Sequence, residues 1–152
     1  MKIGEYLSQS GVTFERHSHT PAYTAQEVAK EEHVSGNILA KTVLVRDGQG
    51  FAMCVLPASH KLDMKKVGKV LKASQPRLAD EQEMAKLFPD AEVGAEPPFG
   101  NLYSLRTFVD QRLAEREDIV FQAGTHREAI RMKFADYESL VKPTVKDLAV
   151  QM

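Results

Sequence analysis

Lys41 is the residue with the clearest potential to bind an anion. It lies between the apolar runs 38–40 and 43–45, and in a strand it shares a face with Val43 and Val45. Burying an unpaired ammonium is costly, so a lysine on such a face needs a reason. One reason is a phosphate held in a pocket. The other is that the ammonium, at the first residue of the strand, reaches water.

The segment 93–100, Val-Gly-Ala-Glu-Pro-Pro-Phe-Gly, is the second candidate because it can offer backbone groups to a substrate oxygen. Its two prolines stiffen the chain, while Gly94 and Gly100 let another molecule approach the backbone closely. Fixed N–H groups in such a loop can stabilise negative charge that develops on a carbonyl oxygen. An ordinary connection between a helix and a strand would use the same residues.

Metal-dependent and serine-based chemistry have less support in the sequence. His17 and His19 stand two apart without a third ligand nearby, which is typical of surface or packing histidines. The single cysteine, Cys54, excludes an intramolecular disulfide and a multi-cysteine metal site. Ser59 beside His60 is the one suggestive nucleophile–base pair, and neighbours in a strand point to opposite sides. We therefore expect no metal and no cofactor.

Strands and helices must bring Lys41 and the 93–100 segment together. Two strand-like runs, 41–46 and 51–56, flank an Asp-Gly turn and predict a hairpin. Apolar spacing and capping patterns predict helices at 2–10, 24–33, 64–71 and 80–88, and Asp136 is expected to cap a last short helix. Further strands are expected at 12–16, 103–109, 119–123 and 129–134. This order predicts an α/β (α+β) fold with a mixed, mostly antiparallel curved sheet flanked by helices.

Length and composition narrow the class of protein. With 152 residues, 43% hydrophobic and 27% charged, the sequence predicts one globular domain over residues 1–152. A net charge of -1 argues against a protein that coats DNA without sequence specificity. A protein that binds only one end of an RNA can nevertheless be nearly neutral. The lysines of 61–72 form either a solvated face or a contact with RNA phosphates. No apolar run approaches the ~20 residues of a membrane helix, so we expect a cytoplasmic protein without a DNA or membrane partner.

The chain also carries an ordered series of short motifs. These are HTPAYTA at 19–25, ILAKTVLV at 38–45, LP at 56–57, LD at 62–63, RLA at 77–79, VG at 93–94, PFG at 98–100, VD at 109–110 and AG at 123–124. No single motif is specific, but their order and spacing together resemble the YbaK and prolyl-tRNA synthetase-associated editing-domain family. The resemblance spans nearly the whole chain, as in a free-standing editing domain.

The resemblance implies a hydrolase that cleaves the ester between a wrong amino acid, such as cysteine or alanine, and the 3′ end of tRNA. It gives a catalytic role to Lys41, which would bind the phosphate near the terminal adenosine, and to Gly94. A ribose hydroxyl of the tRNA would assist the attacking water, and no metal would take part. The resemblance also implies that Pro98, Phe99, Gly100, Gly124 and His126 bind the substrate.

Two functional hypotheses are compatible with this fold. One is the trans-acting aminoacyl-tRNA deacylase, and the other is an inactive module that binds a tRNA, a nucleotide or an aminoacyl-tRNA synthetase. A pocket in which Lys41 faces the Gly94 loop would favour hydrolysis, whereas a filled cavity would favour binding alone. Glu96 puts a carboxylate where family members often carry small or apolar residues, which points to a different substrate.

Overall fold

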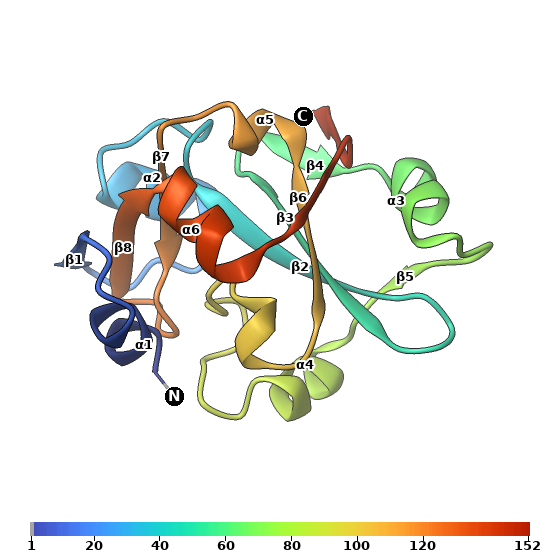
Figure 1. Ribbon diagram of the computed structural model, residues 1–152, viewed down its shortest axis with the longest axis horizontal. Helices are drawn as coiled ribbons and strands as arrows, with labels where there is room; N and C mark the ends of the chain where they lie inside the picture. Colours follow the sequence, from blue (N-terminus) through green and yellow to red (C-terminus); the bar gives the residue numbers. More distant parts are fainter. Residues whose placement is uncertain (1) are drawn as a thin grey trace.

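A five-stranded mixed sheet forms the centre of the computed structural model, which describes residues 2–152 (Figure 1). Its strand order is β5 (Arg77–Leu78), β2 (Ala40–Arg46), β3 (Phe51–Pro57), β6 (Arg106–Asp110) and β9 (Thr144–Lys146). The first three strands pair antiparallel, whereas β6 runs parallel to β3 and β9 runs parallel to β6. The predicted mixed architecture is therefore confirmed.

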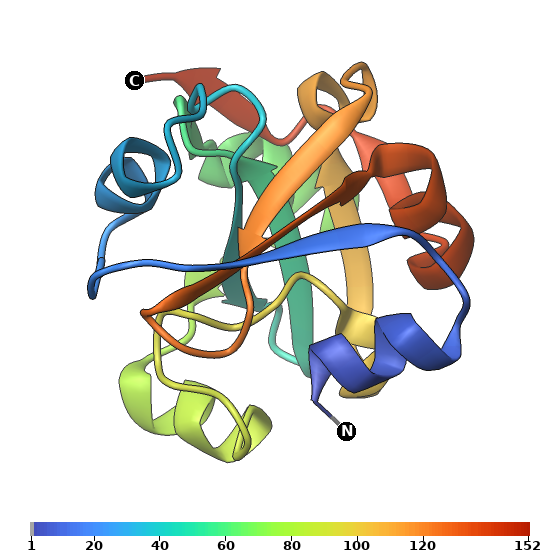
Figure 2. The same ribbon diagram turned by 90° about the vertical axis from the view of Figure 1, so that its left-hand side faces the viewer.

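A second sheet of three antiparallel strands lies beside the first and is seen most clearly in Figure 2. Its order is β1 (Phe14–Ser18), β8 (Glu128–Lys133) and β7 (Asp118–Gln122). A parallel bridge between Leu39 and Val120 joins the start of β2 to β7. This bridge brings the strand that carries Lys41 next to the hairpin formed by β7 and β8.

Helices cover the outside of the sheets, with α6 packed across the front in Figure 1. No helix within residues 2–152 is long and apolar enough to cross a lipid bilayer. A short two-stranded sheet, β4 (His60–Leu62) with β10 (Ala149–Gln151), closes one end. The helices are α1 (Ile3–Gln9), α2 (Ala25–Glu31), α3 (Met64–Leu71), α4 (Glu81–Leu87), α5 (Gln111–Ala114) and α6 (Phe134–Val141), with a 3₁₀ turn η1 (Gly100–Leu102).

Several helix starts follow from capping side chains that the sequence indicates. The Thr24 hydroxyl accepts the N–H of Glu27 at the start of α2. Asp80 and Glu83 form a complete capping box at the start of α4. At the predicted hairpin turn, the Asp47 carboxylate accepts the N–H groups of residues 49 and 50. Local hydrogen bonding therefore sets these boundaries.

Several predicted boundaries are wrong, and the strand predicted at 12–16 is β1 at Phe14–Ser18. The strand predicted at 103–109 begins only at Arg106, because residues 100–102 form η1 and Ser104 has a φ of 57°. Asp136 does not cap the last helix, since α6 begins at Phe134 with Lys133 at the N-cap position and no side-chain cap. Asp136 instead lies in the first turn, where its negative charge is favourable next to the helix dipole.

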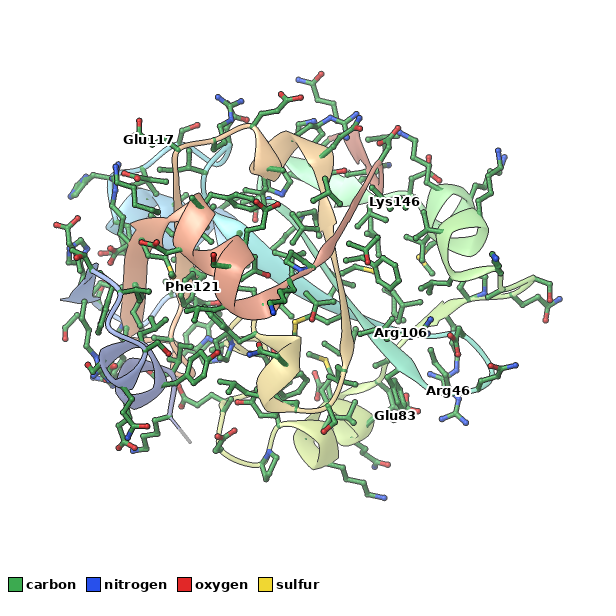
Figure 3. All side chains as sticks on the ribbon, viewed as in Figure 1. Arg46, Glu83, Arg106, Glu117, Phe121 and Lys146 are labelled. Atoms are coloured by element: carbon green, nitrogen blue, oxygen red, sulfur yellow. The ribbon has the colours of Figure 1, made fainter. Side chains whose placement is uncertain are left out.

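An aromatic cluster anchors the chain immediately after the two prolines. The Phe99 ring is fully buried, with ring centroids 5.4 Å from Phe121 and 5.1 Å from Tyr137. Phe121 lies in the interior, as Figure 3 shows. The Tyr137 hydroxyl donates a hydrogen bond to the Pro98 carbonyl oxygen at 2.7 Å. The second half of the 93–100 segment is thus part of the core.

A substitution at Gly100 can test whether this segment is anchored in the core, because the surroundings of Gly100 leave no room for a side chain. A Cβ there would collide with the Thr107 side chain and lie 2.8 Å from the Leu105 carbonyl oxygen. We expect Gly100→Ala to lower the free energy of unfolding by about 1–3 kcal/mol. Each kcal/mol corresponds to a fall in Tm of about 2–4 °C in thermal denaturation.

Gly50→Ala is the matched control, since nothing lies within 4 Å of its added Cβ. Its Tm should stay close to that of the parent protein. An unchanged Tm for Gly100→Ala, together with lost substrate binding, would contradict the structural role and favour direct contact between Gly100 and the substrate.

Candidate functional site

A pocket of about 140 Å³ lies where the start of β2, the end of β7 and the 93–100 segment meet. We call this segment the glycine–proline loop. The pocket brings Lys41 and Gly94 together, two residues far apart in the sequence. Its lining residues are Tyr23, Ala25, Leu39, Ala40, Lys41, Thr42, Gly94, Glu96 and Gln122.

Lys41 contributes a positive charge that no other described residue neutralises. Its side chain is partly buried, and burial lowers the pKa of its ammonium below the usual value. Within residues 2–152, its ammonium takes part in no ion pair or hydrogen bond. An unpaired, partly desolvated ammonium attracts an anion more strongly than one in open water. Lys41 is therefore suited to hold a phosphate at the pocket.

Glu96 contributes a buried carboxylate to the same pocket, and the residue is only 4% exposed. Both of its carboxylate oxygens accept the Gly94 N–H, at 3.1 and 3.0 Å. Burial raises the pKa of Glu96, while hydrogen bonds from its own N–H and from Gly94, and the charge of His126, act in the opposite direction. No lysine or arginine within the described residues forms an ion pair with it. The carboxylate therefore keeps unused acceptor capacity.

The N–H groups of Gly94 and Ala95 in the glycine–proline loop are already engaged, contrary to the expectation that they face a substrate oxygen. The Gly94 N–H donates to Glu96, and the Ala95 N–H donates to the Glu92 carbonyl oxygen at 3.0 Å. The two prolines that follow have no N–H to offer. The physical reason is that backbone donors near the interior need partners, and the nearby carboxylate supplies one.

The turn 123–126 holds the loop in place through backbone hydrogen bonds. The Gly124 carbonyl oxygen accepts the Glu92 N–H at 2.8 Å, and the Gly124 N–H donates to the Ala95 carbonyl oxygen at 2.9 Å. Gly124 has a φ of 92°, a left-handed conformation that favours glycine. It lines a separate cavity of about 110 Å³ and not the Lys41 pocket. Gly124 therefore positions the loop from behind.

His126 strengthens this connection and supports the wall of the pocket. Its Nε2 lies 2.9 Å from the Val93 carbonyl oxygen, and its backbone N–H donates to the Glu92 carboxylate at 2.7 Å. The Tyr23 ring packs on the imidazole with centroids 4.6 Å apart, and Tyr23 is 64% exposed. Gly94 has a φ of 91°, and a Cβ there would lie 3.4 Å from His126. His126 thus contacts residues that line the pocket without being part of its lining.

The other residues expected to bind substrate do not reach the pocket. Pro98, Phe99 and Gly100 are buried behind it, in the core and against β6. Sequence reasoning also missed Gln122, whose amide donates to the Ala22 carbonyl oxygen at 3.1 Å. A polar residue within the apolar run 119–123 is the signal that could have identified it.

Ser59 and His60 are closer than the sequence analysis expected. The Ser59 Oγ lies 2.9 Å from His60 Nδ1. Ser59 belongs to the turn that leads into β4 and His60 is the first residue of that strand, so the alternation of side chains within a strand does not apply to this pair. Neither residue lines the pocket that holds Lys41. The pair is therefore separate from the candidate site.

The two N-terminal histidines share the carboxylate of Glu32, the C-cap residue that follows α2. His17 Nδ1 lies 2.8 Å from one Glu32 oxygen, and His19 Nε2 lies 3.8 Å from the other. Folding therefore brings the Glu32 carboxylate to two histidines that have no further ligand close to them in the sequence. Even so, no group of three or more His, Cys, Asp or Glu side chains in residues 2–152 is placed to hold a metal ion.

The chain is similar in sequence and in fold to known proteins. The sequence model of the aminoacyl-tRNA editing domain family matches residues 19–140, which include both Lys41 and the glycine–proline loop. The chain belongs to the aminoacyl-tRNA editing domain family. The resemblance found in the sequence motifs is thereby confirmed.

Relatives of this editing domain are distant in sequence. The chain is 22% identical over 142 residues to the prolyl-tRNA editing protein ProX of Acetoanaerobium sticklandii, covering 90% of this chain and 86% of that protein. A crystal structure of a candidate trans-editing enzyme for prolyl-tRNA synthetase has a TM-score of 0.83 at 21% identity, covering 97% and 94% of the two chains. Another, of a hypothetical protein, has a TM-score of 0.89 at 22% identity, covering 99% and 100%. The structural matches establish the shared fold.

The buried charge of Glu96 leads to a prediction about stability and pH. Because its pKa is raised in the folded state, the contribution of this carboxyl to stability is fully present below its ordinary pKa of 4.5 and is lost as pH rises through the raised value. We expect Glu96→Gln to raise Tm at pH 7.5 by about 2–4 °C, the shift that about 1 kcal/mol produces. The difference should shrink below pH 4.5.

Glu31→Gln on the exposed face of α2 is the control and should not change Tm at either pH. A Glu96→Gln protein that is less stable than the parent at pH 7.5 would contradict the assignment, because it would show that the ionised carboxylate stabilises the free protein.

Proposed function

We propose that this editing domain is an aminoacyl-tRNA deacylase that acts in trans, hydrolysing the ester at the 3′ end of a mischarged tRNA. The observation that carries the proposal is the small pocket in which the unpaired ammonium of Lys41 faces the glycine–proline loop. Ligand sites for drug-sized molecules are typically about 300–1,000 Å³. A pocket of about 140 Å³ suits the aminoacyl end of a tRNA better than a whole nucleotide.

Lys41 would bind the phosphate next to the terminal adenosine and so fix the ester against the loop. Holding the reacting groups in place supplies much of the rate enhancement in such a site. No Ser-His-Asp arrangement lies in the pocket lining. This fits a mechanism in which a ribose hydroxyl of the tRNA assists the attacking water, as the family resemblance implies.

The amino acid is proposed to be small, with alanine and cysteine as the first candidates. The name of ProX refers to prolyl-tRNA editing, so we propose tRNA for proline as the carrier and prolyl-tRNA synthetase as the source of the mischarged product. Because translation supplies this substrate, the activity belongs in the cytoplasm, within one domain over residues 1–152. Neither DNA nor a membrane has a role in this proposal.

A deacylation panel tests the proposal directly. Purified protein is mixed with Ala-, Cys- and Ser-tRNA for proline and with correctly charged Pro-tRNA, and the remaining ester is followed over time. We expect at least one mischarged species to be hydrolysed well above the spontaneous rate, while the correct species is spared. Tight tRNA binding without hydrolysis of any species would contradict the proposal and favour the binding module.

Substitution of Lys41 is the most direct test of a single residue in the proposed reaction. We expect Lys41→Ala to lower kcat/KM by about 10–150-fold, because hydrogen bonds to charged groups contribute about 1.5–3 kcal/mol. Lys41→Arg should also be impaired, since a planar guanidinium does not replace a compact ammonium. Melting curves check that both variants fold.

Lys146→Ala is the matched control, because Lys146 is an exposed lysine on the edge strand β9 (Figure 3). It should retain parental activity. Activity of Lys41→Ala within two-fold of the parent would remove Lys41 from the site.

The reaction is predicted to need no protein-bound metal. Dialysis against a strong chelator should leave the deacylation rate unchanged once the magnesium that folds the tRNA is restored. Elemental analysis provides the complementary measurement: one equivalent of a transition metal per chain, lost together with activity, would overturn this prediction.

A further inference from the structure

Glu96 is the unusual feature of the pocket, because this buried carboxylate forms no ion pair with any side chain in residues 2–152. The residue is 4% exposed, and within the described residues 2–152 it receives hydrogen bonds only from backbone N–H groups, those of Gly94 and of Glu96 itself. Two N–H donors leave part of the acceptor capacity of an ionised carboxylate unused, since its two oxygens offer about four lone pairs. A buried charge without a partner is costly unless a ligand compensates it.

The position of this charge indicates what the ligand carries. Lys41 and Glu96 line one small pocket, yet neither is paired with an oppositely charged side chain within residues 2–152. A ligand that compensates both must present an anion and a cation a short distance apart. The aminoacylated end of a tRNA has this character, because a phosphate lies next to the terminal ribose and the amino acid carries a free α-ammonium group.

We propose that Glu96 binds the α-ammonium group of the aminoacyl ester, so that the pocket accepts aminoacyl-tRNA and rejects N-acylated forms such as peptidyl-tRNA. The inference rests on the proposed function, because it assigns a second contact to the same substrate. An N-acylated substrate carries no positive charge at this position and would leave the buried carboxylate unpaired. The pocket would thereby spare growing peptide chains.

The loop is built to keep the carboxylate in place. Gly94 adopts a φ of 91°, which turns its N–H onto the Glu96 oxygens, and its conformation is held by the contact of His126 with the Val93 carbonyl oxygen. A carboxylate fixed in this way loses little freedom when it binds an ammonium group. The expected gain is a charge-assisted hydrogen bond, which is stronger than a neutral one.

Two stable analogues test the proposal independently of catalysis. Both are 3′-amino-3′-deoxyadenosine 5′-monophosphate joined by an amide, one to alanine and one to lactic acid, so that they differ only in an ammonium or a hydroxyl group. Calorimetry should show that the parent protein binds the alanyl analogue at least about 10-fold more tightly. In the Glu96→Gln variant the affinities for the two analogues should differ by no more than about 3-fold. The side chain keeps its size and an acceptor for the Gly94 N–H.

Two further variants separate Glu96 from general effects. Glu31→Gln, which neutralises an exposed carboxylate of α2, should keep the full preference. Lys41→Ala should weaken both analogues by the same factor and keep their ratio. Glu96→Asp, which retains the charge but shortens the side chain, should give an intermediate ratio and serves if the glutamine variant does not fold.

Each result decides the proposal. Equal binding of the two analogues by the parent protein, a full preference in Glu96→Gln, or no binding of either analogue would overturn it. A preference that depends on Glu96 in a protein that deacylates no tRNA would support the ammonium site and contradict the proposed function. Deacylation without any preference would support the function and overturn the ammonium site.

Discussion

Hydrogen bonds between residues 92–95 and the turn 123–126 are the constraint on which the candidate site depends. Gly124 exchanges two backbone bonds with Glu92 and Ala95, and His126 adds contacts to Val93 and Glu92. These bonds fasten the glycine–proline loop to the β7–β8 hairpin, while the bridge from Leu39 to β7 brings in the strand that carries Lys41. Without this fastening, residues about fifty positions apart would not share one pocket.

The loop has a second anchor on its other side. Phe99 is fully buried against Tyr137, and the Tyr137 hydroxyl holds the Pro98 carbonyl oxygen. Motif residues that would be taken for substrate contacts from sequence therefore act mainly by fixing the backbone. The polar half of the loop faces the pocket and the apolar half fills the core. Burial lowers the pKa of Lys41 and raises the pKa of Glu96, and shifts of this kind are often found at functional sites.

Much of the fold could be predicted from the sequence because local signals are strong where they exist. The capping box of Asp80 and the Asp47 turn identified α4 and the β2–β3 hairpin. Very short strands such as β5 have too few residues for a periodic pattern. The pocket itself was only partly predictable: Lys41 stood out on an apolar strand, but the bond that occupies the Gly94 N–H depends on the Glu96 rotamer, which no spacing rule gives.

The most direct test of this account is a crystal structure of the protein with the alanyl amide analogue of aminoacyl-adenosine 5′-monophosphate. The account predicts the phosphate within about 3 Å of the Lys41 Nζ and the α-ammonium within about 3 Å of a Glu96 carboxylate oxygen. An analogue bound outside the pocket of Lys41 and the glycine–proline loop would contradict the account. So would one bound with its ammonium turned away from Glu96 to solvent.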